Sequence, residues 1–102
     1  MKYMVDIDGT ICRNTTSDYP NSTPIPERIA RINALVDAGH EVHYWTARGG
    51  NSGIDWSELT TKQLAEWGCK YTTVNFCKPS YDLWIDDKAI NSETYFENPS
   101  YR

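Results

Sequence analysis

The sequence has little basic charge and no long hydrophobic run. Ten Lys and Arg stand against fourteen Asp and Glu, which gives a net charge of −4 and a pI of about 5.0. Proteins that grip a nucleic-acid backbone usually present a basic face, so this balance argues against nucleic acid as a partner. No stretch approaches the roughly 20 apolar residues of a membrane span, and no signal-peptide apolar block precedes the first motif. We therefore expect no membrane partner and a cytoplasmic protein.

Cysteines are also few. Cys12, Cys69 and Cys77 show no metal-ligand spacing, and any disulfide scheme leaves one of them unpaired. A reducing compartment is the simpler expectation. At 102 residues the chain has room for one hydrophobic core, and neither an internal repeat nor a linker divides it. The sequence therefore predicts a single domain over 1–102.

Residue periodicity predicts four strands and two helices. The helices are expected at 26–38, with Pro26 in the first turn and Gly39 as the C-terminal cap, and at 55–67, ended by Gly68. Asp55 and Glu58 predict a capping box at the start of the second helix. The strands are expected at 2–8, 41–46, 70–76 and 81–85. This order implies right-handed crossovers and a largely parallel sheet, and therefore an α/β fold.

Two segments have no clear period. Residues 11–23, rich in Asn, Thr, Ser and Pro, are expected to form an irregular loop or a tight hairpin. Because this segment directly follows Asp6 and Asp8, two acids at the end of the first strand, it is a candidate flap over a site, with a plain surface loop as the alternative. Residues 91–102 are expected to form a C-terminal tail that wraps the surface or frays.

The first strand ends in two acids. Side chains alternate along a strand, so Asp6 and Asp8 leave on the same face, with Cα atoms roughly 6–7 Å apart. Two carboxyls at that spacing can converge on one cation or phosphoryl group. A simple Asp8-Gly9 turn is the alternative, but it leaves Asp6, an acid in an apolar strand, unexplained.

The other strand ends carry further reactive groups: Thr46, Lys78, Asp86 and Asp87. In a parallel sheet these ends lie along one edge, where ligands bind in open α/β folds. The set suits phosphoryl transfer: one carboxylate attacks phosphorus, and Mg²⁺ neutralises the phosphate. A lysine and a hydroxyl hold the remaining phosphate oxygens, while a second carboxyl moves protons.

The run Asp6-Ile7-Asp8-Gly9-Thr10, then Thr46, Lys78-Pro79 and Asp86-Asp87, resembles the four motifs of the haloacid dehalogenase (HAD) superfamily, in the family's order. The resemblance implies an aspartyl-phosphate on Asp6, general acid and base work by Asp8, and phosphate contacts from Thr46 and Lys78. It also implies Mg²⁺ held by Asp6, Asp8, Asp86 and Asp87, and leaves open which of the last two touches the metal directly. Candidate substrate-binding residues are Gly9, Thr10, Ala47 and Arg48; for Arg48 a surface role is the alternative.

The resemblance implies a Rossmannoid three-layer sandwich and a phosphoric monoester hydrolase. Neither place where relatives carry a cap domain has a long enough insertion, so we expect an open site without a cap. The Thr46-Ala47-Arg48-Gly49 loop and the Ile85-Asp86-Asp87 ending are most similar to small capless phosphatases of capsule or surface polysaccharide synthesis. A small sugar phosphate or a nucleotide is the expected substrate.

Two other functions use similar residues. A phospho-accepting receiver module also has acids, a Thr and a Lys on a parallel sheet, but its accepting Asp ends a later strand, where this chain has Thr46. A catalytically inactive phosphate-binding domain would be expected to lack one of the acids or Lys78, and none is missing.

The many aromatic residues, enriched at interfaces, further predict a homo-oligomer, most simply a dimer.

Overall fold

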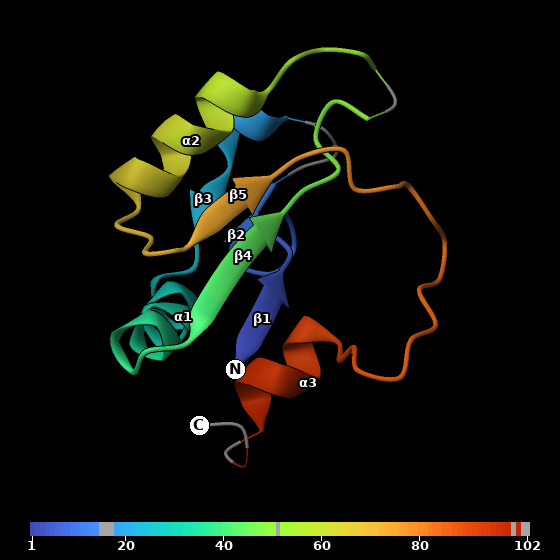
Figure 1. Ribbon diagram of the computed structural model, residues 1–102. Coiled ribbons are helices and arrows are strands. Elements are labelled where there is room, and N and C mark those ends of the chain that lie inside the picture. The colour runs from blue at the N-terminus through green and yellow to red at the C-terminus, as the bar shows by residue number, and fades with distance from the viewer. Residues whose placement is uncertain (15–17, 51, 99, 101–102) are drawn as a thin grey trace.

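The computed structural model describes residues 1–14, 18–50, 52–98 and 100. Three strands, β1 (Lys2–Val5), β4 (Glu41–Trp45) and β5 (Thr73–Asn75), form a parallel sheet in the order β1-β4-β5 (Figure 1). Lys2 pairs with Glu41 and His43 with Thr73, so the carboxyl ends of the strands meet at one edge. The predicted α/β class with a mainly parallel sheet is confirmed.

Helices α1 (Pro26–Asp37) and α2 (Ser57–Glu66) supply the apolar layer over one face of this sheet. Pro26 occupies the first turn of α1, and Gly68, at φ 71°, follows the end of α2, both as expected. The core joins side chains from the sheet, the loops after β1 and both helices: Val5, Ile7, Ile11, Cys12, Ile29, Ile32, Val42, Tyr44 and Leu64. Every second residue of β4 faces this core, which is why Val42 and Tyr44 are fully buried.

The opposite face of the sheet carries the alternate residues. These side chains line a shallow hollow on the surface: Lys2, Met4, His43, Trp45, Thr73, Asn75 and Phe76. Met4 is 55% exposed there. Of the three layers expected, the part of the chain described therefore builds the sheet and the helical layer on one side.

The two ends of the segment 11–23 pair with each other and form a small hairpin. β2 (Cys12–Arg13) pairs antiparallel with β3 (Thr23–Pro24), and a 3-10 turn, η1 (Tyr19–Asn21), precedes β3. Of the two conformations expected for this segment, the hairpin is therefore the one formed, although residues 15–17 of the proposed flap lie outside the described residues.

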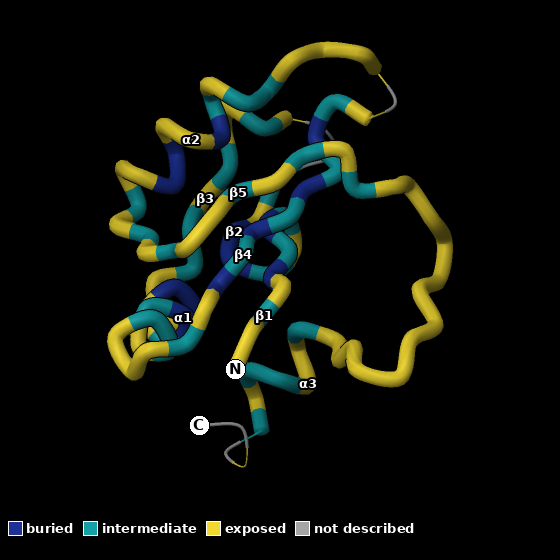
Figure 2. Tube along the Cα trace, viewed as in Figure 1, coloured by how far each residue is buried: buried dark blue, intermediate teal, exposed yellow. Residues whose placement is uncertain are grey.

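The predicted strand at 81–85 is wrong. Residues 79–91, which we term the arm, arch away from the sheet, and every residue from 81 to 90 is exposed (Figures 1 and 2). Leu83 is 76% and Ile85 88% exposed. The physical reason lies in Trp84, whose ring packs edge-on to Tyr81 and Trp45 at 5.0 and 6.0 Å, so the segment is held near the end of β4 instead of pairing with the edge of β1.

Three smaller expectations also need correction. The tail contains a short helix, α3 (Ser92–Glu97), capped by the Asn91 side chain, which accepts from the Glu93 amide at 2.9 Å. Residues 99, 101 and 102 of the tail lie outside the described residues. Asp55 makes no capping box; its carboxylate accepts from the amide and hydroxyl of Ser57 in a local turn. The third strand of the parallel sheet, β5, is shorter than the predicted 70–76.

None of the described helices is long and apolar enough to cross a bilayer.

Candidate active site

A pocket of about 300 Å³ opens at the carboxyl ends of the parallel strands. Its walls come from the loop after β1, the hairpin, the loop after β4 and the start of the arm: Asp6, Asp8, Asn14, Tyr19, Ala47, Arg48, Lys78, Pro79, Ser80 and Tyr81. The sheet edge predicted from the sequence is therefore where the structure has its polar pocket.

Asp6 lies in this pocket with both carboxylate oxygens engaged. Lys78 Nζ lies 3.6 Å from Oδ1, and the Thr10 hydroxyl donates to Oδ2 at 3.2 Å. Burial raises the pKa of Asp6 above its ordinary value, and the positive charge of Lys78 opposes that shift. A carboxylate that is partly desolvated, oriented by a hydroxyl and next to a cation is arranged as a nucleophile for a negatively charged substrate.

Lys78 is directed to Asp6 by the backbone that precedes it. Cys77 has φ 65°, a left-handed conformation that turns the chain directly after β5, and the Lys78 amide then donates to the Thr46 carbonyl at 3.1 Å. Three aromatic rings surround the ammonium group at 5.5–6.0 Å: Trp45, Tyr81 and Trp84. Cation–π attraction and the Asp6 carboxylate thus hold one ammonium in place.

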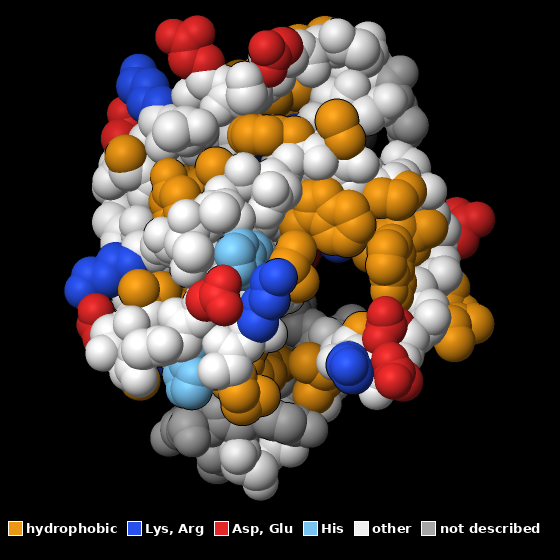
Figure 3. Space-filling model, viewed as in Figure 1, with side chains coloured by type: hydrophobic (Ala, Val, Ile, Leu, Met, Phe, Trp, Pro, Cys, Tyr) orange, Lys and Arg blue, Asp and Glu red, His pale blue; other side chains and the backbone are white. Residues whose placement is uncertain are grey.

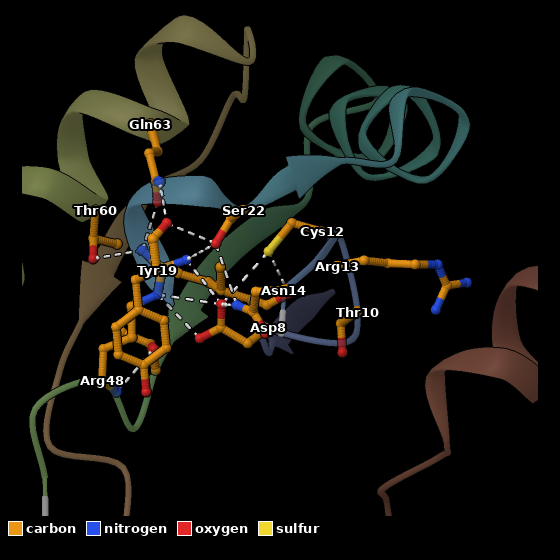
Figure 4. Close-up of polar contacts among 12 residues, drawn as sticks. Asp8, Thr10, Cys12, Arg13, Asn14, Tyr19, Ser22, Arg48, Thr60 and Gln63 are labelled. Atoms are coloured by element: carbon orange, nitrogen blue, oxygen red, sulfur yellow. Dashed lines mark hydrogen bonds and ion pairs between the residues drawn. The ribbon is translucent and has the colours of Figure 1, made fainter. Parts of the chain in front are cut away.

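Asp8 is bound from several sides (Figure 4). Arg48 donates to its carboxylate through Nε and Nη2, at 3.0 and 2.8 Å, and Asn14 donates to Oδ1. The buried Cys12 thiol also donates to Oδ1 at 3.5 Å. Burial, followed by the Asp8 charge, raises the pKa of Cys12 to about 12, so this thiol keeps its proton at neutral pH.

Two residues after β4 have different positions from those predicted. Thr46 is 1% exposed and outside the pocket wall; its hydroxyl accepts from the Arg48 amide at 3.1 Å. The Arg48 side chain is fully buried, which excludes the surface role. Arg48 belongs to the pocket wall, but its guanidinium donates to Asp8, Thr60 and Gln63 within the protein. Ala47 lines the pocket as expected.

Gly9 and Thr10 lie just outside the pocket wall. Gly9, at φ 79°, makes the tight turn after Asp8, and its carbonyl accepts from Ser92 of α3 at 3.3 Å. Thr10 lies apart from the Asp8 cluster (Figure 4), and its hydroxyl contacts Asp6 instead. In this structure both residues act on the site by shaping or orienting the two acids.

Asp86 and Asp87 do not reach the pocket. They lie on the exposed arm, where Asp86 accepts from the amide of Lys88 at 2.7 Å and from the Trp84 indole at 3.4 Å. The Lys88 amide contact is the main reason why the pKa of Asp86 lies below its ordinary value. Within the described ranges, no group of three or more acidic, His or Cys side chains is arranged to hold a metal ion. The arrangement thus brings together two of the four carboxylates implied for a metal, which does not fit the complete set.

The pocket also includes residues that sequence reasoning did not single out for it: Asn14, Tyr19, Ser80 and Tyr81. Tyr19 covers the Arg48 guanidinium at 4.7 Å and packs edge-on to Trp56. The signal available for Asn14 and Tyr19 was their place in the candidate flap. For Tyr81 no such signal existed, because the strand expected at 81–85 would have carried it away from the pocket.

Comparisons with known proteins support the fold. A crystal structure of an MCSG target from Vibrio cholerae matches with a TM-score of 0.83 and 29% identity, over 97% of this chain and 90% of the other. A D,D-heptose bisphosphate phosphatase from B. bronchiseptica, crystallised with magnesium and phosphate, matches with a TM-score of 0.57 and 20% identity, over 74% of this chain and 49% of the other. No family model and no curated protein matches the chain.

Together the sheet order, the pocket at its carboxyl edge and these two structures define the class. The chain has a small α/β fold with a mainly parallel sheet, and it shares this fold with both structures, one of which is a phosphatase.

Proposed function

We propose that this protein is a phosphatase that hydrolyses a phosphomonoester through an aspartyl-phosphate on Asp6. The observation that carries the proposal is the setting of Asp6: its carboxylate faces the pocket between the Lys78 ammonium and the Thr10 hydroxyl, beside a second carboxylate on Asp8. The phosphatase structure with the same fold agrees with this activity.

The reaction divides between the two acids. A carboxylate oxygen of Asp6 attacks phosphorus, the bond from phosphorus to the leaving oxygen breaks, and Asp8 supplies that oxygen with a proton. In the second step a water gives a proton to Asp8 and attacks phosphorus. The bond between phosphorus and Asp6 then breaks, and inorganic phosphate leaves. Lys78 offsets the repulsion between the Asp6 carboxylate and the phosphate in both steps.

Mg²⁺ is the cofactor we propose, because the phosphatase of like fold was crystallised with it and because Asp6 and Asp8 offer the oxygen ligands that this ion prefers. Asp86 and Asp87 would complete the set only if the arm moved toward the pocket. The ion would neutralise phosphate charge. The two steps described above are assigned to side chains of the chain itself.

A small phosphorylated substrate suits the pocket volume of about 300 Å³, which is at the lower end for small-molecule sites. We propose a sugar phosphate or a nucleotide, with the sugar phosphate favoured because the phosphatase of like fold is named for a heptose bisphosphate. A capsule or surface polysaccharide pathway remains a proposal from the sequence resemblance. The three cysteines are free thiols, which supports the cytoplasm as the compartment we propose.

The test is phosphate release from a panel of phosphorylated metabolites with Mg²⁺, comparing the wild type with Asp6→Asn. We expect turnover by the wild type and a loss of at least about 10⁴-fold in the variant, because an amide is a poor nucleophile. Asp82→Asn, an exposed acid on the arm, is the control and should keep full activity. Normal turnover by folded Asp6→Asn would overturn the proposal.

A further inference from the structure

Arg48 is a cation with no exposed surface and a complete set of partners. A guanidinium has five N–H donors. Its Nε and Nη2 donate to Asp8, Nη1 donates to Thr60 at 3.1 Å and to Gln63 at 2.6 Å, and Nη2 also lies 3.5 Å from the Ser22 hydroxyl. All five donors therefore have an acceptor within the protein. A substrate phosphate could bind this group only by displacing one of them.

The partners of Arg48 belong to separate parts of the fold (Figure 4). Asp8 follows β1, Ser22 belongs to the hairpin, and Thr60 and Gln63 project from α2. Gln63 in turn donates to the Tyr19 carbonyl at 2.7 Å, and the Tyr19 ring covers the guanidinium. Because the planar guanidinium is held from three directions, its two contacts with Asp8 fix the plane of that carboxylate.

The two oxygens of Asp8 are unequally engaged. Oδ1 accepts from Arg48 Nη2, from Asn14 and from the Cys12 thiol, and lies 3.3 Å from Arg48 Nε. Among the described residues Oδ2 has one donor in the contacts of Asp8, Arg48 Nε at 3.0 Å. A carboxylate has about four acceptor positions, so Oδ1 is saturated while Oδ2 keeps capacity for another group.

We propose that Arg48 is a positioning residue for Asp8: it locks Oδ1 into the protein and leaves Oδ2 as the oxygen that carries the proton to and from the reacting centre. The proposal rests on the phosphatase function proposed above. It replaces the substrate-binding role expected for Arg48 from the sequence with an action through Asp8.

A positioning role predicts that Arg48 and Asp8 act as one unit. We would measure kcat and KM for the wild type, Arg48→Met, Asp8→Asn and the double variant, on an aryl phosphate and an alkyl phosphate. An aryl oxygen leaves without needing a proton, so the aryl substrate keeps the Asp8→Asn variant measurable. We expect Arg48→Met to lower kcat by on the order of 10²-fold at nearly unchanged KM, more for the alkyl substrate, and to have no further effect in the Asp8→Asn background. Arg48→Lys should recover part of the loss.

Arg28 offers a matched control. It is likewise a buried arginine with an acidic partner, Glu93 at 3.0 Å, and an aromatic ring, Phe96 at 4.8 Å. It also donates to the Thr10 carbonyl at 3.2 Å, but none of these partners lines the pocket. Arg28→Met should lower the melting temperature, and any fall in its kcat should be equal for the two substrates. Of the two arginine variants, only Arg48→Met should show the leaving-group dependence.

Two kinetic results would overturn the proposal. A raised KM with kcat retained in Arg48→Met would show direct contact with the substrate, and a loss that persists in the Asp8→Asn background would show that Arg48 does not act through Asp8. The melting temperatures of the same four proteins test the pair without any turnover. The two single changes should be non-additive, and additive changes would disprove the coupling even if the proposed activity failed.

Discussion

Asp6 is a carboxylate that the fold keeps partly out of water. Its side chain is 37% exposed, and burial outweighs the Lys78 charge in raising its pKa. The same group is therefore costly to ionise in the folded protein. For the reaction proposed above this is useful, because a partly desolvated carboxylate beside an ammonium is a good nucleophile. The cost of ionising Asp6 in the folded protein should make the stability of the protein depend on pH.

We predict the sign of that dependence from the linkage between protons and folding. Between the ordinary value of 3.8 and the raised pKa of Asp6, the folded state binds more protons than the unfolded state, so the Asp6 contribution to stability falls as the pH rises through this window. Asp6→Asn lacks this titration. Its melting temperature relative to the wild type should therefore increase from pH 3 to pH 7, measured with EDTA present. A difference that is flat or that decreases with pH would contradict the prediction.

At the scale of the element, the loop after β4 brings Ala47 and Arg48 to the site. Gly49, at φ 82°, allows the chain to turn directly after Arg48, and a Cβ there would collide with the carbonyl of Ile54. Gly53 also has a positive φ, 73°, but a Cβ there would meet no atom within 4 Å. Substitutions at these two glycines therefore distinguish the cost of backbone strain from the cost of a steric collision within one loop.

We predict that Gly49→Ala destabilises the protein more than Gly53→Ala. Left-handed strain costs roughly 1–2 kcal/mol at either position, and the collision at Gly49 should add about 1–3 kcal/mol. Because Gly49 adjoins Arg48, its substitution should also lower kcat, while Gly53→Ala should leave kcat within a factor of about two. Urea unfolding and steady-state kinetics would measure both effects. Equal losses of stability would show that the loop can relax around the added methyl group.

At the scale of the whole molecule, the arm is the part that departs from the sheet expected from the sequence. β1 pairs only with β4 among the described strands, and the arm beyond that edge exposes Leu83 and Ile85. Figure 3 shows an opening between the arm and the rest of the molecule. Moving Asp86 and Asp87 to the pocket would gather four carboxylates, which repel one another unless a cation compensates their charge.

We therefore predict that Mg²⁺ binding and the position of the arm are coupled. Saturating Mg²⁺ should raise the melting temperature. At one hundred times the dissociation constant, the free energy of unfolding should increase by about 2.7 kcal/mol. It should also slow proteolysis within the arm. Asp86→Asn and Asp87→Asn should weaken both effects, whereas Asp82→Asn, on the same exposed arm, should not. If Asp6→Asn removes the Mg²⁺ response but both arm variants retain it, the metal site does not include the arm.

The state of association belongs to the same scale. The sheet face lined by Met4, His43 and Trp45 and the apolar side chains of the arm are open in the single chain. We keep the dimer expected from the sequence as a proposal, since exposed aromatic and aliphatic groups of this kind are typical of interfaces. Light scattering over a concentration series should give a mass of about twice 11.7 kDa. A monomeric mass at tens of micromolar would reject it.

Much of the fold could be predicted from local patterns. Pro26, Gly39 and Gly68 delimit the two long helices, and the β-branched and aromatic residues of 41–46 form the central strand, because these signals depend on backbone conformation within a few residues. Strand ends in a parallel sheet share one edge, so the meeting of Asp6, Asp8, Ala47 and Lys78 in one pocket followed from the predicted order of elements.

Only the tertiary structure decided which side chains act on each other. Nothing in the spacing of Asp8, Arg48 and Gln63 shows that one guanidinium joins them, since that contact depends on how α2 packs beside the sheet. The run 81–85 has strand composition, yet a strand exists only where a neighbour pairs its backbone, and the packing of Trp84 near β4 keeps the run away from β1. The sequence by itself determined which residues are available for the phosphoryl chemistry that we propose, and long-range packing decided which of them face the pocket.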